Sequence, residues 1–110
     1  MNHINTEKHL IYSTKELLTI NHQLLTVNYI KVKVKLFAIY QEVYQQEEIE
    51  LELPENSPVK DILKQMIEVM PQLSSWQSIT KLAVNLDFVS SDFTLKDGDE
   101  VALIPPVSGG

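Results

Sequence analysis

From residue 30 onward the chain contains two stretches in which apolar and charged residues alternate, over 30–38 and over 48–53. A period of two is typical of a strand with one buried face, so we predict a strand in each stretch. The segment around Tyr40–Gln46 is then a hairpin connection. The charged residues of the first strand are lysines and those of the second are glutamates, which we expect to face each other across the sheet: Lys31, Lys33, Lys35, Glu48, Glu50 and Glu52.

The next stretch has the period of a helix. Pro54 ends the second strand, and Ser57-Pro58 is typical of a helix start, with Ser57 as the N-cap. Apolar residues then recur on one helical face until Pro71 ends the helix: Val59, Ile62, Leu63, Met66, Ile67 and Met70.

The remaining pattern predicts three further strands. They lie at 82–86, at Phe88-Val89 and at 101–104, with a tight turn at Asp97-Gly98 before the last one. Pro105-Pro106 prevents the last strand from continuing. The order β-β-α-β-β-β predicts an α+β fold with one main helix packed across a mixed sheet, a roll of the ubiquitin-like β-grasp kind, over residues 30–110.

Residues 1–29 show a weaker pattern. Their leucines fit a helical stripe only in part, because Thr, Asn and His interrupt it. We therefore expect a weakly ordered or partly helical N-terminal extension. The chain has no apolar run long enough to span a membrane and no secretory signal, which predicts a cytoplasmic protein without a membrane partner.

The net charge and the absent residue types argue against several classes of function. The net charge is −6, and all nine basic residues are lysines. A negative domain without arginine is a poor ligand for phosphate backbones, so nucleic-acid binding is not expected. The chain has no cysteine, and its three histidines lie within residues 1–29. The alternating glutamates are expected to form a solvated strand face, so no metal site is predicted. The domain therefore has few side chains suited to catalysis.

Two of the three glycines lie at the C-terminal end of the sequence. Of three glycines, Gly98 is explained by its turn, whereas Gly109 and Gly110 are the last two residues. A terminal carboxylate can be activated by adenylation, and glycines can thread a narrow channel in a partner because they lack a side chain. Pro105 and Pro106 stiffen the exit from the sheet. We therefore predict that the Gly110 carboxylate is the reactive group and that residues 105–109 contact partners: Pro105, Pro106, Val107, Ser108 and Gly109.

Three apolar residues are out of phase with the core positions of their strands. Phe37 falls on the lysine-bearing face of the first strand, and Phe88 and Ile104 also point away from the core in this register. A single exposed apolar residue carries little information, but three near the tail would form a patch that binds a partner.

The C-terminal third resembles a known family. Residues 95–102 (LKDGDEVA) and 104–110 (IPPVSGG), with Ala83-Val84-Asn85 and 34–38 (VKLFA), are similar to the MoaD family, the small subunits of molybdopterin synthase. The resemblance covers residues 30–110, and positions matching Phe37, Phe88 and Ile104 are apolar partner contacts in that family. The chain departs from the family at Ile104, where an aromatic residue is common.

The resemblance implies a sulfur carrier of molybdenum cofactor biosynthesis. A MoeB-like enzyme would use ATP to adenylate Gly110, and a sulfur donor would convert it to a thiocarboxylate. The tail would then enter a MoaE-like large subunit, in an assembly of two small and two large subunits, and give sulfur to cyclic pyranopterin monophosphate. The large subunit would supply the catalytic side chains, and no cofactor would be bound stably. Two alternatives stay open: a carrier for thiamine synthesis or tRNA thiolation, and a ubiquitin-like tagging or binding module.

Overall fold

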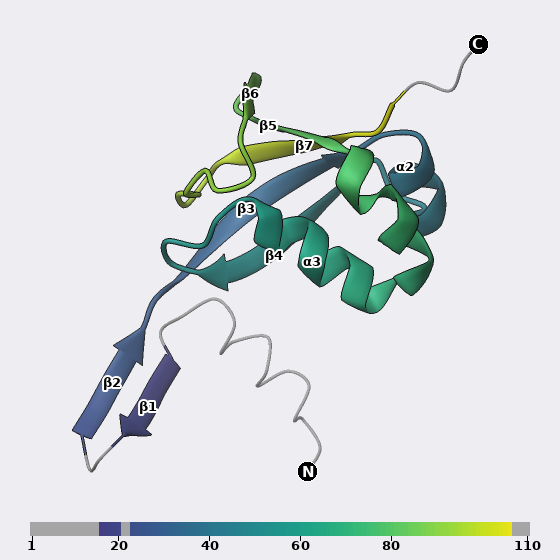
Figure 1. Cartoon of the computed structure of the whole chain (residues 1–110). Coiled ribbons are helices and arrows are strands. Elements are labelled where there is room, and N and C mark those ends of the chain that lie inside the picture. The colour runs from purple at the N-terminus through teal and green to yellow at the C-terminus, as the bar shows by residue number, and fades with distance from the viewer. Residues whose placement is uncertain (1–15, 21–22, 107–110) are drawn as a thin grey trace.

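The computed structural model describes residues 16–20 and 23–106 (Figure 1). Its helices and strands follow one another as β1 (Glu16–Ile20), β2 (Gln23–Val27), β3 (Tyr29–Leu36), α2 (Ile39–Tyr44), β4 (Glu48–Pro54), α3 (Lys60–Val69), the 3-10 helix η1 (Pro71–Ile79), β5 (Lys81–Val84), β6 (Asp87–Val89) and β7 (Glu100–Ile104). No helix in the described part of the chain is both long enough and apolar enough to cross a membrane.

Five strands form one mixed sheet in the order β4-β3-β7-β5-β6. The central strand β7 is parallel to β3 and antiparallel to β5, and the outer pairs are antiparallel. Helix α3 lies across one face of this sheet (Figure 1). The predicted α+β arrangement, a mixed sheet with one main helix packed across it, is confirmed.

The core lies between the sheet and α3. The alternating residues Val32 and Val34 of β3 are buried while the lysines between them face outward, as the period of two predicts. From α3 the apolar stripe contributes Ile62, Leu63 and Met66. Because α3 covers one face of the sheet, the other face is left open along β3, β7 and β5, and it carries the candidate site.

The structure differs from the sequence prediction in the N-terminal extension. For 16–27 we expected weak order or partial helix, but β1 and β2 are antiparallel strands that pair with each other in a separate two-stranded sheet. Strand β2 leads through Asn28 into β3 (Figure 1). The sequence has β-branched residues at Thr19-Ile20 and Thr26-Val27, which favour extended backbone, and the leucine spacing obscured this signal.

Two local predictions are also corrected. The connection between β3 and β4 contains the six-residue helix α2, which is too short to show a helical period in the sequence. Ser57 is not the N-cap of α3, because the helix starts at Lys60 and its N-cap position is Val59. The Ser57 hydroxyl instead donates a hydrogen bond of 2.6 Å to the carbonyl of Pro54, so it closes the turn that follows β4.

Candidate functional site: the open face of the sheet and the tail

One row of residues crosses the open face from edge to edge. Strand register places one residue from each of the five strands in this row, in the order Glu48, Lys35, Ala102, Ala83 and Phe88. The third and fourth positions are alanines, and their neighbours on both sides have large side chains. The open face is therefore low in the middle, over β7 and β5, and higher at its edges.

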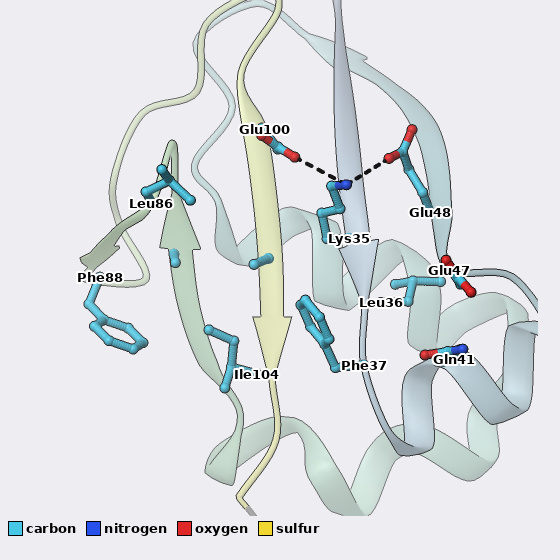
Figure 2. A pocket seen from close by; sticks show the side chains of 12 residues that line it. Lys35, Leu36, Phe37, Gln41, Glu47, Glu48, Leu86, Phe88, Glu100 and Ile104 are labelled. Carbon is cyan, nitrogen blue, oxygen red and sulfur yellow. Dashed lines mark ion pairs between the residues drawn. The ribbon is translucent and has the colours of Figure 1, made fainter.

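The part of the face around Lys35, on β4, β3 and the start of β7, is charged. The Lys35 ammonium lies 3.1 Å from Glu48 and 3.6 Å from Glu100, so it stands between two carboxylates (Figure 2). The hydrogen bond and charge of Glu48, with Glu100 second, raise the pKa of Lys35 above its usual value. The predicted pairing of lysines and glutamates across β3 and β4 is confirmed by the register, in which Lys33 faces Glu50 and Lys35 faces Glu48.

Apolar residues lie beside this charged part, and one hollow spans both. The hollow, of about 490 Å³, is lined by Phe37, Phe88, Ile104 and the alanines of the row, together with Lys35 and three glutamates. Phe37 is 47% exposed and Phe88 is 67% exposed, which is unusual for phenylalanine. The structure thus brings together the three residues that strand parity singled out, and Figure 2 shows them along the same face. Their role in binding a partner stays a prediction.

The backbone beside Phe37 is strained. Ala38 has φ 52° and ψ −121°, a conformation that suits glycine, and the amide of Tyr40 donates a 3.1 Å hydrogen bond to the carbonyl of Phe37. These are the features of a type II′ turn with alanine where glycine is preferred. The turn ends β3 and starts α2 at Ile39. A fixed turn of this kind sets the direction of Phe37 at the edge of the hollow.

Leu86 also lines the hollow. We predicted it to lie in a strand at 82–86, but β5 ends at Val84. It occupies the two-residue turn Asn85-Leu86 between β5 and β6, and its side chain is 94% exposed. Asn85 and Leu86 have φ values of 51° and 76°. Two positive φ values between paired strands define a type I′ turn. The sequence does not indicate this turn, because Asn-Leu is not a common turn pair.

Asp97 and Asp99, in the turn before β7, have structural roles. Asp97 accepts a 2.8 Å hydrogen bond from the amide of Lys31, and Asp99 accepts one of 2.8 Å from the amide of Lys96. The first contact ties the turn that the sequence predicted at Asp97-Gly98 to β3, and the second closes the turn itself. Among the described residues, no three His, Cys, Asp or Glu side chains are grouped so that they would hold a metal ion.

The tail leaves the sheet at the edge of the hollow. Val101 and Leu103 of β7 are fully buried, whereas Ile104 faces the hollow. Pro105 is buried and Pro106 is exposed, so the chain emerges from the protein at Pro106. The predicted tail residues Val107, Ser108, Gly109 and Gly110 lie outside the described residues. The base of the tail is thus held by the core and lies next to the apolar hollow.

Comparison with known proteins gives a consistent assignment. Over 81 residues the chain is 38% identical to the molybdopterin synthase sulfur carrier subunit of Dictyostelium discoideum, covering 71% of this chain and 94% of that protein. It is 40% identical over 83 residues to the subunit of the same name from Chlamydomonas reinhardtii, covering 74% of this chain and all of that protein.

Solved structures agree with these relatives. A structure described as subunit 1 of a molybdopterin converting factor from Pyrococcus furiosus is 35% identical, with a TM-score of 0.63 over 71% of this chain and 99% of that one. A chain in a structure described as the complex of subunits 1 and 2 of the Helicobacter pylori molybdopterin-converting factor is 26% identical, with a TM-score of 0.51 over 74% of this chain and all of that one. These neighbours support the ubiquitin-like β-grasp assignment of the fold.

The family match covers the whole site. The ThiS family profile matches residues 34–110, from the second half of β3 to the last glycine. The matched region therefore contains the hollow, its three predicted apolar residues and the tail. Because the match takes in most of the chain, this protein belongs to the ThiS family.

Proposed function

We propose that this protein is the sulfur carrier of molybdenum cofactor biosynthesis and the small subunit of a molybdopterin synthase. The observation that carries this proposal is the match to curated sulfur carrier subunits over 94% and 100% of their own lengths. The ThiS family profile also reaches the terminal Gly109-Gly110, the part of the chain to which this proposal assigns the chemistry.

The proposed reaction takes place on the Gly110 carboxylate and uses ATP and a sulfur donor as co-reactants. A carboxylate oxygen attacks the α-phosphate of ATP and pyrophosphate leaves, which gives an acyl adenylate. A sulfur nucleophile then attacks the carbonyl carbon, and AMP leaves with the bonding electron pair. With a sulfide-level nucleophile the product is a thiocarboxylate. Its sulfur attacks cyclic pyranopterin monophosphate, and water then cleaves the acyl–sulfur bond, which leaves the sulfur on the pterin and restores the Gly110 carboxylate. A MoeB-like activating enzyme would catalyse the first steps, and a MoaE-like large subunit would catalyse the last.

The structure supports this division of labour. The hollow beside the tail is lined in part by alanines, isoleucine and phenylalanines, which bind surfaces but do not transfer protons, and its single lysine is ion-paired with Glu48 and Glu100. Buried Val101, Leu103 and Pro105 hold the start of the tail in the core. The prolines fix φ near −65°, which lowers the entropy lost when a partner grips the tail. In this proposal the folded domain binds the partners and positions the C-terminal carboxylate for reaction.

The hollow beside the tail is the proposed docking surface for the large subunit. Phe37, Phe88 and Ile104 would supply the apolar contacts, and residues 105–109 would enter the partner. The complex of subunits 1 and 2 from Helicobacter pylori supports a partner of this kind. An assembly of two small and two large subunits is proposed for this chain as well.

A reconstituted synthesis tests the proposal. The thiocarboxylated chain is mixed with its large subunit and cyclic pyranopterin monophosphate, and molybdopterin is measured as its fluorescent oxidation product. We expect product only when chain, large subunit and thiocarboxylate are all present. A thiocarboxylate that forms but yields no molybdopterin would assign the carrier to thiamine or tRNA thiolation. Conjugates of the chain to lysines of other proteins would favour the tagging alternative.

A further inference from the structure

Leu86 combines two unfavourable features. Its side chain is 94% exposed, so it gains almost nothing from burial within this chain. Its φ of 76° lies in the left-handed region, which is costly for a residue with a branched apolar side chain. Glycine at this position would give the favoured Asn-Gly pair of a type I′ turn. Neither the turn nor the core of this chain therefore explains the leucine.

The turn that carries Leu86 is firmly fixed. The amide of Asn85 donates a 2.8 Å hydrogen bond to the carbonyl of Glu100, and the amide of Glu100 donates one of 3.0 Å to the Asn85 side chain. The Asn85 side chain also donates a 3.0 Å hydrogen bond to Asp99. These three contacts hold the tip of the β5–β6 hairpin against the start of β7. Leu86 is therefore presented in one place, at the rim of the hollow.

The lining of the hollow is apolar at one end and acidic at the other. Leu86 and Phe88 lie at the β5–β6 end, whereas Glu47 and Glu48 lie at the β4 end (Figure 2). Three glutamates line the hollow against a single lysine, Lys35, which is already shared by Glu48 and Glu100. A partner that fits this surface by charge therefore has positive charge opposite Glu47, and it has an apolar side chain opposite Leu86.

We propose that Leu86 is a docking residue for the large subunit, and that the large subunit's facing surface is apolar at Leu86 and carries lysine or arginine beside Glu47. This inference rests on the proposed function and adds to it the chemistry of the partner surface. The hollow continues to the base of the tail through Ile104, so a partner seated there also reaches residues 105 and 106.

Opposite effects on stability and on binding test the Leu86 assignment. Leu86→Asn and Leu86→Gly relieve the strained turn, so we expect the Tm to rise by a few degrees. The same variants lose the apolar contact, so we expect the affinity for the large subunit, measured by surface plasmon resonance, to fall at least about tenfold. Val69→Asn is the matched control, because Val69 is 64% exposed on α3, which covers the other face of the sheet.

A charge reversal tests the acidic end. Glu47→Lys is expected to slow association with the large subunit and to weaken the dependence of the association rate on salt. Glu68→Lys makes the same change in net charge on α3, outside the hollow, and is expected to have a much smaller effect. Equal effects of the two reversals would show that only the net charge matters, and would overturn the basic-partner assignment.

The outcomes separate this inference from the proposed function. Normal binding of the wild-type chain to the large subunit, with unchanged affinity of both Leu86 variants, would overturn the inference and leave the proposed function standing. Failure of the wild-type chain to bind would instead contradict the proposed function. A wild-type chain that sediments as a dimer, and as a monomer after Leu86→Asn, would show that a second copy occupies the surface, and would also overturn the inference.

Discussion

Lys35 and Ala102 are register partners on the adjacent strands β3 and β7, and both line the hollow on the open face. Lys35 lies between the carboxylates of Glu48 and Glu100. Ala102 and Ala83 form a low floor beside Phe37, Phe88 and Ile104. The same surface thus combines a charged part with an apolar part that is suited to a partner.

Filling the hollow should block docking without unfolding the protein. In Ala102→Met, the larger side chain occupies the floor of the hollow, and we expect the affinity for the large subunit to fall at least about tenfold. Ala102→Ser changes the volume little and should bind close to the wild-type level. Titration calorimetry measures both affinities, and circular dichroism checks the fold. Wild-type affinity in Ala102→Met would remove the hollow from the interface.

A charge on Phe37 should weaken the same complex. We expect Phe37→Asp to cost about 2 kcal/mol or more of binding free energy, because an apolar anchor becomes a buried charge. Phe93→Asp is the control, since Phe93 is 40% exposed but does not line the hollow. If both variants bind equally well by calorimetry, Phe37 is not a contact of the large subunit.

Relief of strain at Ala38 should stabilise the fold. Ala38 has φ 52° in a type II′ turn, so Ala38→Gly is expected to raise the free energy of unfolding by about 0.5–1 kcal/mol. In Ala83→Gly, where glycine replaces alanine in the interior of β5, we expect a loss of about the same size. Urea titrations measure both changes. A loss of stability in Ala38→Gly would mean that the turn is not strained.

Stability should fall at alkaline pH. Burial raises the pKa of Tyr40 and of Tyr44 above 10.0, and Glu48 raises that of Lys35 above 10.5. A folded-state pKa above the unfolded value means that the folded state holds its proton longer. Unfolding free energy should therefore be nearly level as pH approaches 10 and should decline above it.

The tyrosine contribution can be isolated with Tyr44→Phe. The Tyr44 hydroxyl donates a 2.8 Å hydrogen bond to the carbonyl of Met66, so its loss should cost about 1 kcal/mol near neutral pH. Above pH 10 the variant should lose stability less steeply than the wild type. Urea midpoints from pH 8 to pH 11 measure this slope. Identical slopes in the two proteins would show that Tyr44 does not contribute to the alkaline decline.

The sequence identifies those parts of the site that depend on strand parity. Phe37, Phe88 and Ile104 break the alternation of their strands, and a period of two leaves them only the open face. Ala83 and Ala102 give no such signal, because alanine is common on either face. Leu86 could not be found from the sequence, because its exposure depends on a turn type that the pair Asn-Leu does not indicate.

The main sheet and α3 were predictable because their apolar residues recur with a clear period. Long periodic segments such as β3 and α3 specify which side is buried. Short or weakly patterned elements could not be predicted. Helix α2 has only six residues, too few to show a period. The leucine spacings of β1 and β2 suit either a helix or a strand. The start of α3 was misplaced because the Ser57 hydroxyl bonds to Pro54 instead of capping the helix.

The central claim is that Gly110 carries the sulfur, and mass spectrometry tests it most directly. The full chain is incubated with activating enzyme, ATP and a sulfur donor, and the C-terminal peptide is then analysed. Exchange of one oxygen for sulfur should add about 16 Da to the peptide that ends in Gly110. A chain lacking Gly110 should fold normally, since the buried part of β7 and Pro105 are unchanged, and should gain no mass. An unmodified wild-type peptide, or equal modification of the shortened chain, would contradict the account.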